Sequence, residues 1–218
     1  YNIMKKSIIK IIACLFVASM LLPANAVSAE AASKNQKALK AYEKILSNPT
    51  YSWSSLSNEN KTKDYKFACE DLNGDEVKEL ILYNPTASYG SGYVKILMYV
   101  NNKVKLVSTN SGFGWYKKRK IIQIDDAHTG SYWQERYKLT SNAKTREVSS
   151  YMATDMKEYA KTYKRKEGIL YYTSYKIHGK EMTYRNYKKS EKKLLGGEKM
   201  ITIKEHKNTS TNRKSYLK

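Results

Sequence analysis

The sequence is poor in cysteine, histidine and proline, and it has none of the common catalytic motifs. Among 218 residues there are two cysteines, three histidines and three prolines. Two cysteines cannot build the disulfide framework of a small secreted domain or a four-cysteine zinc site. The G-x-S-x-G elbow, the H-E-x-x-H zinc motif and the phosphate-binding glycine loop are also missing. These absences argue against most familiar enzyme classes.

The three histidines lie far apart in the sequence, at His128, His178 and His206. Asp125 and Asp126 precede His128 closely enough to orient it as a general base, but no nucleophile can be assigned. Neighbouring Asp and His are also common in ordinary loops. A secreted hydrolase of unknown type is therefore the third of three functional interpretations, behind two kinds of binding protein.

Acidic residues are scarce relative to basic ones. Lysine and arginine number 40 against 20 aspartates and glutamates, which gives a net charge of +20. Such a surface attracts polyanions, and outside a cell these include anionic wall polymers and acidic glycans. The densest basic runs are 117–120 and the group Lys188, Lys189, Lys192 and Lys193. Charge runs also occur as solvated faces without a partner, and nothing indicates recognition of a specific nucleic acid.

The sequence lacks a hydrophobic run of membrane-spanning length, but a shorter one lies near the start. From Met4 a basic segment leads to an uncharged run, Ile11–Leu22, which is followed by small residues. This is the pattern of a cleavable secretory signal peptide with a cut after Ala26 or Ala29. The run is shorter than the ~20 apolar residues of a spanning helix, and a lipoprotein cut before Cys14 would leave too short an apolar core. We therefore expect an extracellular protein, free or associated with the cell wall.

The sequence divides into four parts. We expect a signal peptide over 1–29, an N-terminal helix and linker over 30–64, a β-rich domain over 65–207 and a basic tail over 208–218. Apolar residues at helical spacing predict the amphipathic helix over Asn35–Ser47. The expected fold is α+β: an antiparallel β-sheet of about 7–9 strands with an N-terminal helix and a C-terminal helix packed on it.

From Tyr65 onward the apolar period changes to two, and Tyr, Val and Ile become frequent, as is typical of strands. Asn73-Gly74 lies in an expected turn between two such runs, and Asn101-Asn102 predicts a tight hairpin. The expected strands are Tyr65–Leu72, Lys78–Tyr83, Tyr93–Val100, Lys103–Thr109, Lys117–Ile124, Tyr132–Thr140, Arg146–Met152, Ile169–Ile177 and, with a weaker pattern, Met200–Ile203.

A C-terminal helix is expected after the last clear strand. Thr183 is a suitable N-cap and Gly196-Gly197 a suitable end for a helix that carries Tyr187 and Leu194. The segment Thr154–Lys166 fits a short helix or a loop.

Aromatic residues are plentiful, with twenty tyrosines and three tryptophans. Trp53, Trp115 and Trp133 could form a platform on which sugar rings stack. The alternative, which we favour for most of these aromatic residues, is packing in a half-buried sheet, where the ring is covered and a tyrosine hydroxyl meets water.

One motif carries chemistry: an acidic run between the first two expected strands. Five carboxylates fall within residues 70–79 of an otherwise basic chain. Calcium takes six to eight oxygen ligands, which alternating short side chains and a backbone carbonyl can supply. The alternative is a plain hairpin that turns at Asn73-Gly74. The predicted ligands are the side chains at loop positions one, three, five and nine and the carbonyl at position seven: Asp71, Asn73, Asp75, Glu79 and Val77.

The run resembles the calcium loops of FG-GAP or β-propeller type, with the pattern D-x-N-G-D-x-x-x-E-L leading into a strand. Glu76 departs from that pattern, in which glycine usually makes a left-handed turn that glutamate enters at a cost. Together with segments 66–68, 94–107 and 177–181, the loop makes the chain similar to a group of uncharacterised secreted proteins of Gram-positive bacteria. The resemblance implies an extracellular location and a fold more than an activity.

Two functional interpretations from different classes precede the hydrolase. The first is a secreted, non-catalytic binding or wall-associated module that one calcium ion stabilises. The second is a basic extracellular protein that captures polyanions without a metal.

Overall fold

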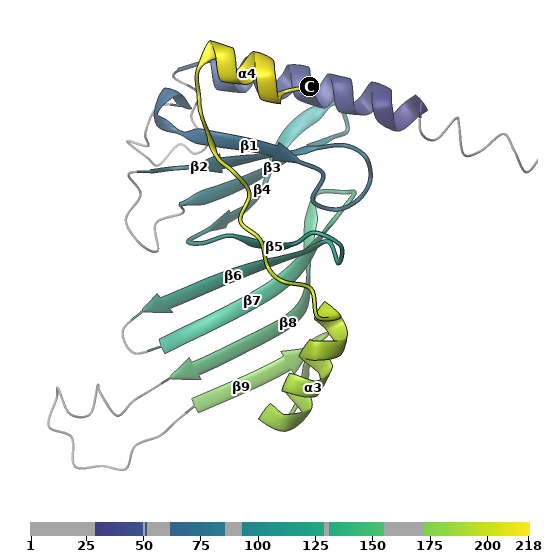
Figure 1. Ribbon diagram of the computed structural model, residues 1–218, viewed down its shortest axis with the longest axis vertical. Helices are drawn as coiled ribbons and strands as arrows, with labels where there is room; N and C mark the ends of the chain where they lie inside the picture. The colour runs from purple at the N-terminus through teal and green to yellow at the C-terminus, as the bar shows by residue number, and fades with distance from the viewer. Residues whose placement is uncertain (1–28, 50, 52–61, 86–92, 129–130, 155–171) are drawn as a thin grey trace, which may run out of the picture.

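The computed structural model describes residues 29–49, 51, 62–85, 93–128, 131–154 and 172–218. Within these residues the chain forms two antiparallel sheets, of five and six strands, with helices at their margins (Figure 1). The predicted α+β class, with an N-terminal and a C-terminal helix, is confirmed. The described strands number eleven, and they are divided between two sheets where the sequence predicted one sheet of about 7–9 strands.

The first sheet is a meander whose outer edge is covered by a segment from late in the sequence. Its strand order is β11-β1-β2-β3-β4. Asn101 and Asn102 form the β3–β4 turn with φ values of 53° and 60°, which confirms the predicted hairpin. The strands are β1 (Lys66–Glu70), β2 (Glu79–Tyr83), β3 (Val94–Val100), β4 (Lys103–Asn110) and β11 (His206–Lys207).

The second sheet is also a meander, in the order β10-β9-β8-β7-β6-β5. The predicted strand Lys117–Ile124 is wrong in its first half, because residues 117–120 form the β5–β6 turn and Lys120 adopts a φ of 53°. Consecutive basic residues favour such an exposed turn over a strand that must bury alternate side chains. The strands are β5 (Gly114–Tyr116), β6 (Ile121–His128), β7 (Ser131–Thr140), β8 (Lys144–Thr154), β9 (Tyr172–Ile177) and β10 (Lys180–Glu181).

The N-terminal helix packs on one face of the first sheet. It is helical from residue 29 to residue 47, so it includes residues before the predicted start at Asn35. The Tyr42 hydroxyl donates to the Lys78 carbonyl at 3.1 Å, which fixes the helix against the start of β2. The buried residues of this contact are Ala38, Leu39, Tyr42, Leu46, Tyr65, Phe67, Val77, Leu80, Leu82 and Leu97.

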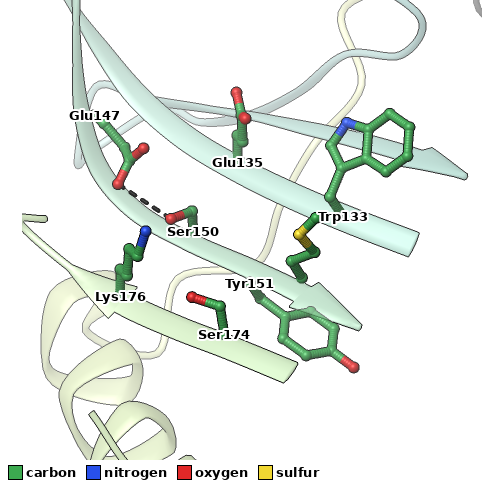
Figure 2. A pocket seen from close by; sticks show the side chains of 8 residues that line it. Trp133, Glu135, Glu147, Ser150, Tyr151, Ser174 and Lys176 are labelled. Carbon is green, nitrogen blue, oxygen red and sulfur yellow. Dashed lines mark hydrogen bonds between the residues drawn. The ribbon is translucent and has the colours of Figure 1, made fainter. Parts of the chain in front are cut away.

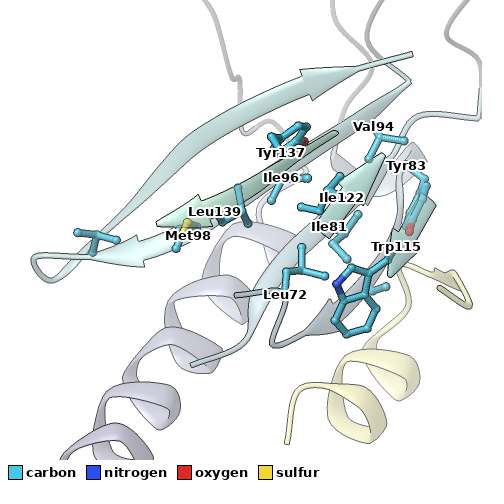
Figure 3. Packing of buried hydrophobic residues seen from close by; sticks show 12 residues of the cluster. Leu72, Ile81, Tyr83, Val94, Ile96, Met98, Trp115, Ile122, Tyr137 and Leu139 are labelled. Carbon is cyan, nitrogen blue, oxygen red and sulfur yellow. The ribbon is translucent and has the colours of Figure 1, made fainter. Parts of the chain in front are cut away.

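A second apolar cluster fills the space between the two sheets (Figure 3). It buries the other face of β2 and β3, so every residue of β2 is buried. This explains the continuous apolar run after Glu79, because a strand covered on both faces has no solvent side. The main residues of the cluster are Leu72, Ile81, Tyr83, Val94, Ile96, Met98, Trp115, Ile122, Tyr137 and Leu139.

Helix α3 (Tyr184–Leu195) lies on the second sheet, and both of its predicted ends are confirmed. The Thr183 side chain accepts a hydrogen bond from the Asn186 amide at 3.4 Å. At the other end, Gly196 adopts a left-handed conformation with φ of 60°.

After α3 the chain runs back past both sheets to the N-terminal helix (Figure 1). The expected strand Met200–Ile203 is reduced to one antiparallel bridge between Ile201 and Trp115. The segment expected as a polar tail forms helix α4 (Ser210–Tyr216), because the Thr209 side chain caps it.

Asn208 ties this returning segment to the N-terminal part of the fold. Its side-chain amide donates to the carbonyls of Leu46 at 2.9 Å and Thr62 at 3.0 Å. The same side chain accepts from Arg213 at 2.9 Å. The segment after α3 is therefore part of the folded structure.

Several predictions fall on residues that the structure does not describe. They are the signal peptide through residue 28, most of the linker with Trp53, the segment from residue 155 to Lys166, and the first three residues of the predicted strand Ile169–Ile177. No helix within the described ranges is both long and apolar enough to cross a membrane.

Candidate functional site: an acidic loop and a basic surface

The predicted ion loop joins β1 to β2, and its polar side chains accept hydrogen bonds from the loop backbone. Asp71 accepts from the amides of Gly74 at 2.6 Å and Glu76 at 3.3 Å. Asn73 and Asp75 each accept from the amide two residues further on, at 2.9 and 3.0 Å. A carboxylate or amide oxygen has two lone pairs, so these bonds leave coordinating capacity.

Glu79 is buried at the base of the loop, with a relative exposure of 1%. Its Oε2 atom accepts from the Leu72 amide at 2.8 Å. Burial is the main cause that raises the pKa of its carboxyl group to about 9, and the charges of Asp75 and Asp71 raise it further. In the described part of the chain no basic side chain forms an ion pair with Glu79. When Glu79 is ionised, no neighbouring positive charge therefore stabilises its carboxylate.

The loop has the type of ligand that calcium prefers, but the ligands are not assembled around one position. All five predicted ligands offer oxygen, which suits calcium. However, the described residues contain no group of three His, Cys, Asp or Glu side chains placed to hold a metal ion together. Asp71, Asn73 and Asp75 share the hydrogen-bonded loop, whereas Glu79 is directed to Leu72. Calcium binding stays a prediction.

Glu76 and Lys120 shape the loop further. Glu76 has a φ of 65°, the left-handed conformation for which the loop pattern has glycine. Lys120 reaches over from the β5–β6 turn, where its ammonium group donates to the Asp71 carbonyl at 3.2 Å and lies 3.9 Å from Oδ2. The second sheet therefore supplies a cation beside the first ligand position.

The turn that carries the first basic run, residues 117–120, packs against the segment that directly follows the second run on α3. The Arg119 guanidinium lies against Gly196 so closely that a Cβ atom there would be 1.8 Å from it. Glu198 accepts from the amides of Lys118 at 2.7 Å and Arg119 at 3.0 Å. The β5–β6 turn is thus held against the C-terminal end of α3.

This junction gathers exposed basic side chains, which we call the basic surface. Both Glu198 oxygens accept backbone amides, and no side chain of this surface forms an ion pair within the described residues. Lys188 differs, because it pairs with Glu191. The members of the basic surface are Lys117, Lys118, Arg119, Lys192 and Lys193.

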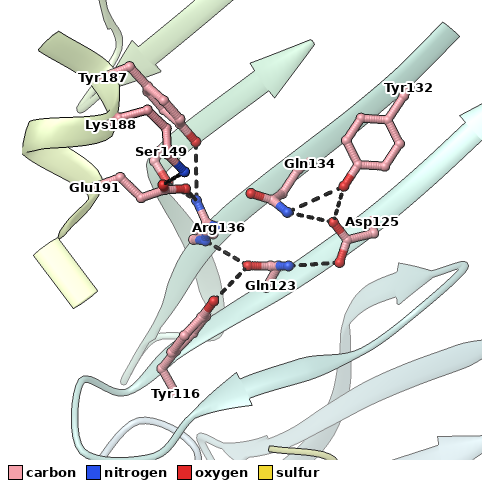
Figure 4. A network of polar contacts seen from close by, with 10 residues as sticks. All are labelled: Tyr116, Gln123, Asp125, Tyr132, Gln134, Arg136, Ser149, Tyr187, Lys188 and Glu191. Atoms are coloured by element: carbon pink, nitrogen blue, oxygen red, sulfur yellow. Dashed lines mark hydrogen bonds and ion pairs between the residues drawn. The ribbon is translucent and has the colours of Figure 1, made fainter. Parts of the chain in front are cut away.

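A buried polar network holds α3 on the second sheet (Figure 4). Arg136 of β7 has a relative exposure of 4% and pairs with Glu191 of α3 at 2.8 Å. It also donates to the Tyr187 hydroxyl at 3.1 Å and to Gln123 at 2.7 Å. Burial opposes ionisation of Glu191, but the hydrogen bond from Lys188 and the charge of Arg136 lower its pKa below the ordinary value. The network fixes where the basic surface lies.

The three histidines are placed on separate elements, and Asp125 shares β6 with His128. His178 lies in the β9–β10 turn and His206 on β11, while His128 ends β6. Asp125, the predicted partner of a general base, accepts from Tyr132 at 2.6 Å and from two glutamine side chains. Burial opposes its ionisation, yet these hydrogen bonds lower its pKa.

The described tryptophans differ in exposure. Trp115 is 1% exposed and belongs to the inter-sheet core, which agrees with the packing alternative. Trp133 lies on β7 and is partly exposed. Cys69 packs partly buried beside the N-terminal helix, and burial raises the pKa of its thiol to about 12, so it stays protonated.

Sequence reasoning did not identify the residues that assemble the basic surface. Glu198 contacts Lys118, which lies 80 positions earlier in the sequence. Arg136 contacts residues of α3 that lie 51 and 55 positions later. No local sequence pattern reveals contacts over such distances. One signal was present: Glu198 directly follows the helix-ending pair Gly196-Gly197, where its carboxylate is free to accept amides from another segment.

The chain matches no known family model, no curated protein sequence and no solved structure at a significant level.

Proposed function

We propose that the protein is an exported, non-catalytic binding module that holds anionic polymers, such as wall polymers or acidic glycans, on the basic surface. The supporting observation is that the turn of the first basic run packs against the C-terminal end of α3, where Glu198 accepts the amides of Lys118 and Arg119. Glu198 keeps its negative charge, but the five basic side chains of the surface outnumber it, so the net charge there is positive.

Electrostatics favours this assignment over a passive solvated face. Neighbouring lysine and arginine charges repel one another by about 1 kcal/mol per pair at 4 Å in water, and a polyanion removes this repulsion. The negative end of the α3 dipole opposes an anion by about 0.3–1 kcal/mol. Five basic side chains outweigh that term, and the release of condensed counterions adds a further favourable entropy.

Retention on an anionic column tests the proposal. The wild type should elute from heparin or teichoic acid between roughly 50 and 200 mM salt. The variant Lys118→Gln/Lys192→Gln/Lys193→Gln should elute earlier, and its salt slope should fall by about one per lost contact.

A matched variant separates the basic surface from net charge. Lys37, Lys40 and Lys44 are exposed on the N-terminal helix, remote from α3 (Figure 1). Their triple replacement by glutamine removes the same charge, but it should leave most of the salt slope in place. Equal losses for both triple variants would contradict the proposed surface and leave only non-specific attraction.

Export is the second part of the proposal, and it is supported by the signal-like pattern. The exported form should begin at Val27 or Glu30. N-terminal sequencing of protein recovered outside the cell tests this. A membrane-retained form that keeps Met4, or one that begins at a lipid-modified Cys14, would contradict it.

We also propose that one calcium ion binds the β1–β2 loop and stabilises the fold. The support is the spacing of oxygens at Asp71, Asn73, Asp75 and the Val77 carbonyl, together with the buried carboxyl group of Glu79, which forms no ion pair within the described residues. Extracellular calcium modules have dissociation constants of about 0.1–1 mM, so a loop strained at Glu76 can still fill outside a cell.

Thermal unfolding in calcium and in chelator tests the loop. Calcium at ~100 times the dissociation constant should stabilise the wild type by about 2.7 kcal/mol. Asp71→Ala should abolish this gain, whereas Asp64→Ala, which removes an exposed carboxylate outside the loop, should keep it. Equal wild-type melting temperatures in the two buffers would favour the plain hairpin.

A further inference from the structure

The face of the second sheet opposite α3 carries a pocket of about 450 Å³ on β7, β8 and β9 (Figure 2). Two rows of directly paired residues line it. One row is largely apolar and the other is charged. The first row is Trp133, Met152 and Ser174, and the second is Glu135, Ser150 and Lys176.

A β-bulge brings a second carboxylate into the pocket. Glu147 and Ser150 are three residues apart on β8, so in a regular strand they would face opposite sides. The register shifts opposite Arg136 and Tyr137, which leaves Val148 as the extra residue. Glu147 then shares the face of Ser150, whose hydroxyl donates to it at 3.1 Å (Figure 2).

The two glutamates make the pocket acidic. Burial and the charge of Glu147 raise the pKa of Glu135 above its ordinary value. Lys176 lines the same pocket, yet within the described residues none of these three side chains forms an ion pair. The pocket therefore has two carboxylates against one ammonium group in a chain with a net charge of +20.

We propose that this pocket binds an amino sugar, whose ring lies on the Trp133 indole and whose ammonium group lies between Glu135 and Glu147. An indole face covers the apolar face of a pyranose ring, and a cation near it gains further attraction. Carboxylates form their strongest hydrogen bonds with charged donors. Lys176 and Ser174 remain to bind the sugar hydroxyls.

The chemistry distinguishes this ligand from others. An anionic sugar would bring a third negative charge beside two carboxylates, which is unfavourable. A neutral sugar would leave the repulsion between Glu135 and Glu147 in place. The pocket volume lies within the usual range for small-ligand sites. The inference is independent of the proposed function, because the basic surface lies at the turn of 117–120 and the end of α3.

Calorimetric titration with two matched oligosaccharides tests the proposal. The probes are a β-linked glucosamine tetramer and its fully N-acetylated counterpart, at pH 6, where the free amines carry charge. The wild type should bind the free-amine tetramer at least about tenfold more tightly, since a charge-assisted hydrogen bond contributes that much. Equal affinities, or no binding of either tetramer at about 1 mM, would overturn the assignment.

Variants locate the site. Glu135→Gln/Glu147→Gln keeps the shape of both side chains and should remove the preference for the amine, while Glu181→Gln on the exposed β10 should retain it. Trp133→Ala should weaken both tetramers, and Trp133→Phe should recover part of the affinity. The basic-surface triple variant should bind the free-amine tetramer at least as tightly as the wild type. New reducing ends on incubation would overturn a binding role and make the glutamates catalytic.

Discussion

The two sheets differ in how much of their surface other elements cover. The first sheet lies between the N-terminal helix and the second sheet, and its β2 is buried along its whole length. Among the described residues, the second sheet is covered only in part, by the first sheet near β5 and by α3 near β9. Tyr132 and Met152 in its open region are each 37% exposed. The first sheet thus provides most of the apolar burial, and the second carries the charged and aromatic surfaces that we propose as binding sites.

The strongest test of this difference in apolar burial removes the same number of apolar side-chain atoms from each sheet. Leu80→Ala on β2, where the side chain is fully buried, should lower the free energy of unfolding by about 2–5 kcal/mol. Met152→Ala on β8 should lower it by less than about 1 kcal/mol, because that side chain already meets water. Urea denaturation measures both. Similar losses would show that the second sheet contributes as much to stability as the first.

The second sheet has one region where a buried contact should matter nearly as much. Glu191→Ala leaves Arg136 buried without its partner and should cost about 3 kcal/mol. Arg136→Met/Glu191→Leu should recover more than half of this, since a buried apolar pair replaces a buried charged pair. Denaturation and amide exchange in α3 measure the effect. A double variant less stable than Glu191→Ala would contradict the account.

The first sheet contains a buried carboxyl group that should give it a pH dependence. Glu79 has a pKa of about 9 in the folded protein against an ordinary 4.5, so between these values the folded state holds a proton that the unfolded state has lost. In chelator, the free energy of unfolding should therefore fall as pH rises from about 5 to 9. Glu79→Gln should remove most of this slope. Parallel pH profiles for the two proteins would contradict the burial of an ionisable Glu79.

The smallest effect concerns the turn between β1 and β2. Glu76 has a φ of 65°, which costs a residue with a Cβ about 1 kcal/mol. Glu76→Gly should raise the free energy of unfolding by up to about 1 kcal/mol, less the added entropy of glycine in the unfolded chain. The same replacement at Glu181, on an extended and exposed strand, should not stabilise. A destabilised Glu76→Gly variant would mean that the side chain has a contact worth more than the strain.

Much of the local structure could be predicted from the sequence because short-range chemistry determines it. The Asn101-Asn102 turn needs residues that tolerate positive φ. At the start of α3 the Thr183 side chain accepts a backbone amide, and at its end the left-handed Gly196 donates its amide to the Lys192 carbonyl. The pairing of strands that are neighbours in sequence follows from such turns. Segment 117–120 was misassigned because the apolar residues that begin at Ile121 form a clear strand pattern, and that pattern was extended backwards over the exposed turn.

The division into two sheets could not be predicted in this way. Alternation indicates which side chains are buried, but not whether they pack against a helix or against another sheet. Ile81 and Leu80 are adjacent on β2 and both buried, yet they belong to different clusters. The break falls between β4 and β5, at residues 111–113, where no pattern in the sequence marks the end of one sheet and the start of another.

The candidate sites also differ in how far their residues are close together in the sequence. The loop from Asp71 to Glu79 is contiguous, so its spacing was visible in the sequence. The pocket is not contiguous: Glu135 and Glu147 are twelve residues apart, and only the β7–β8 register and the bulge at Val148 place them together. The basic surface lies between these cases, since its two runs were visible in the sequence, whereas the contact of Arg119 with Gly196 at the end of α3 was not.

The path of the chain after α3 has a consequence for the order in which the molecule is completed. Synthesis delivers residues 206–216 after the other described strands, yet His206 and Lys207 cover the outer edge of β1, and Asn208 ties Leu46 to Thr62. Until that segment arrives, β1 presents an unpaired strand edge that another chain can join. A truncated chain that stops before residue 206 leaves this edge open and should therefore self-associate more readily than the intact chain.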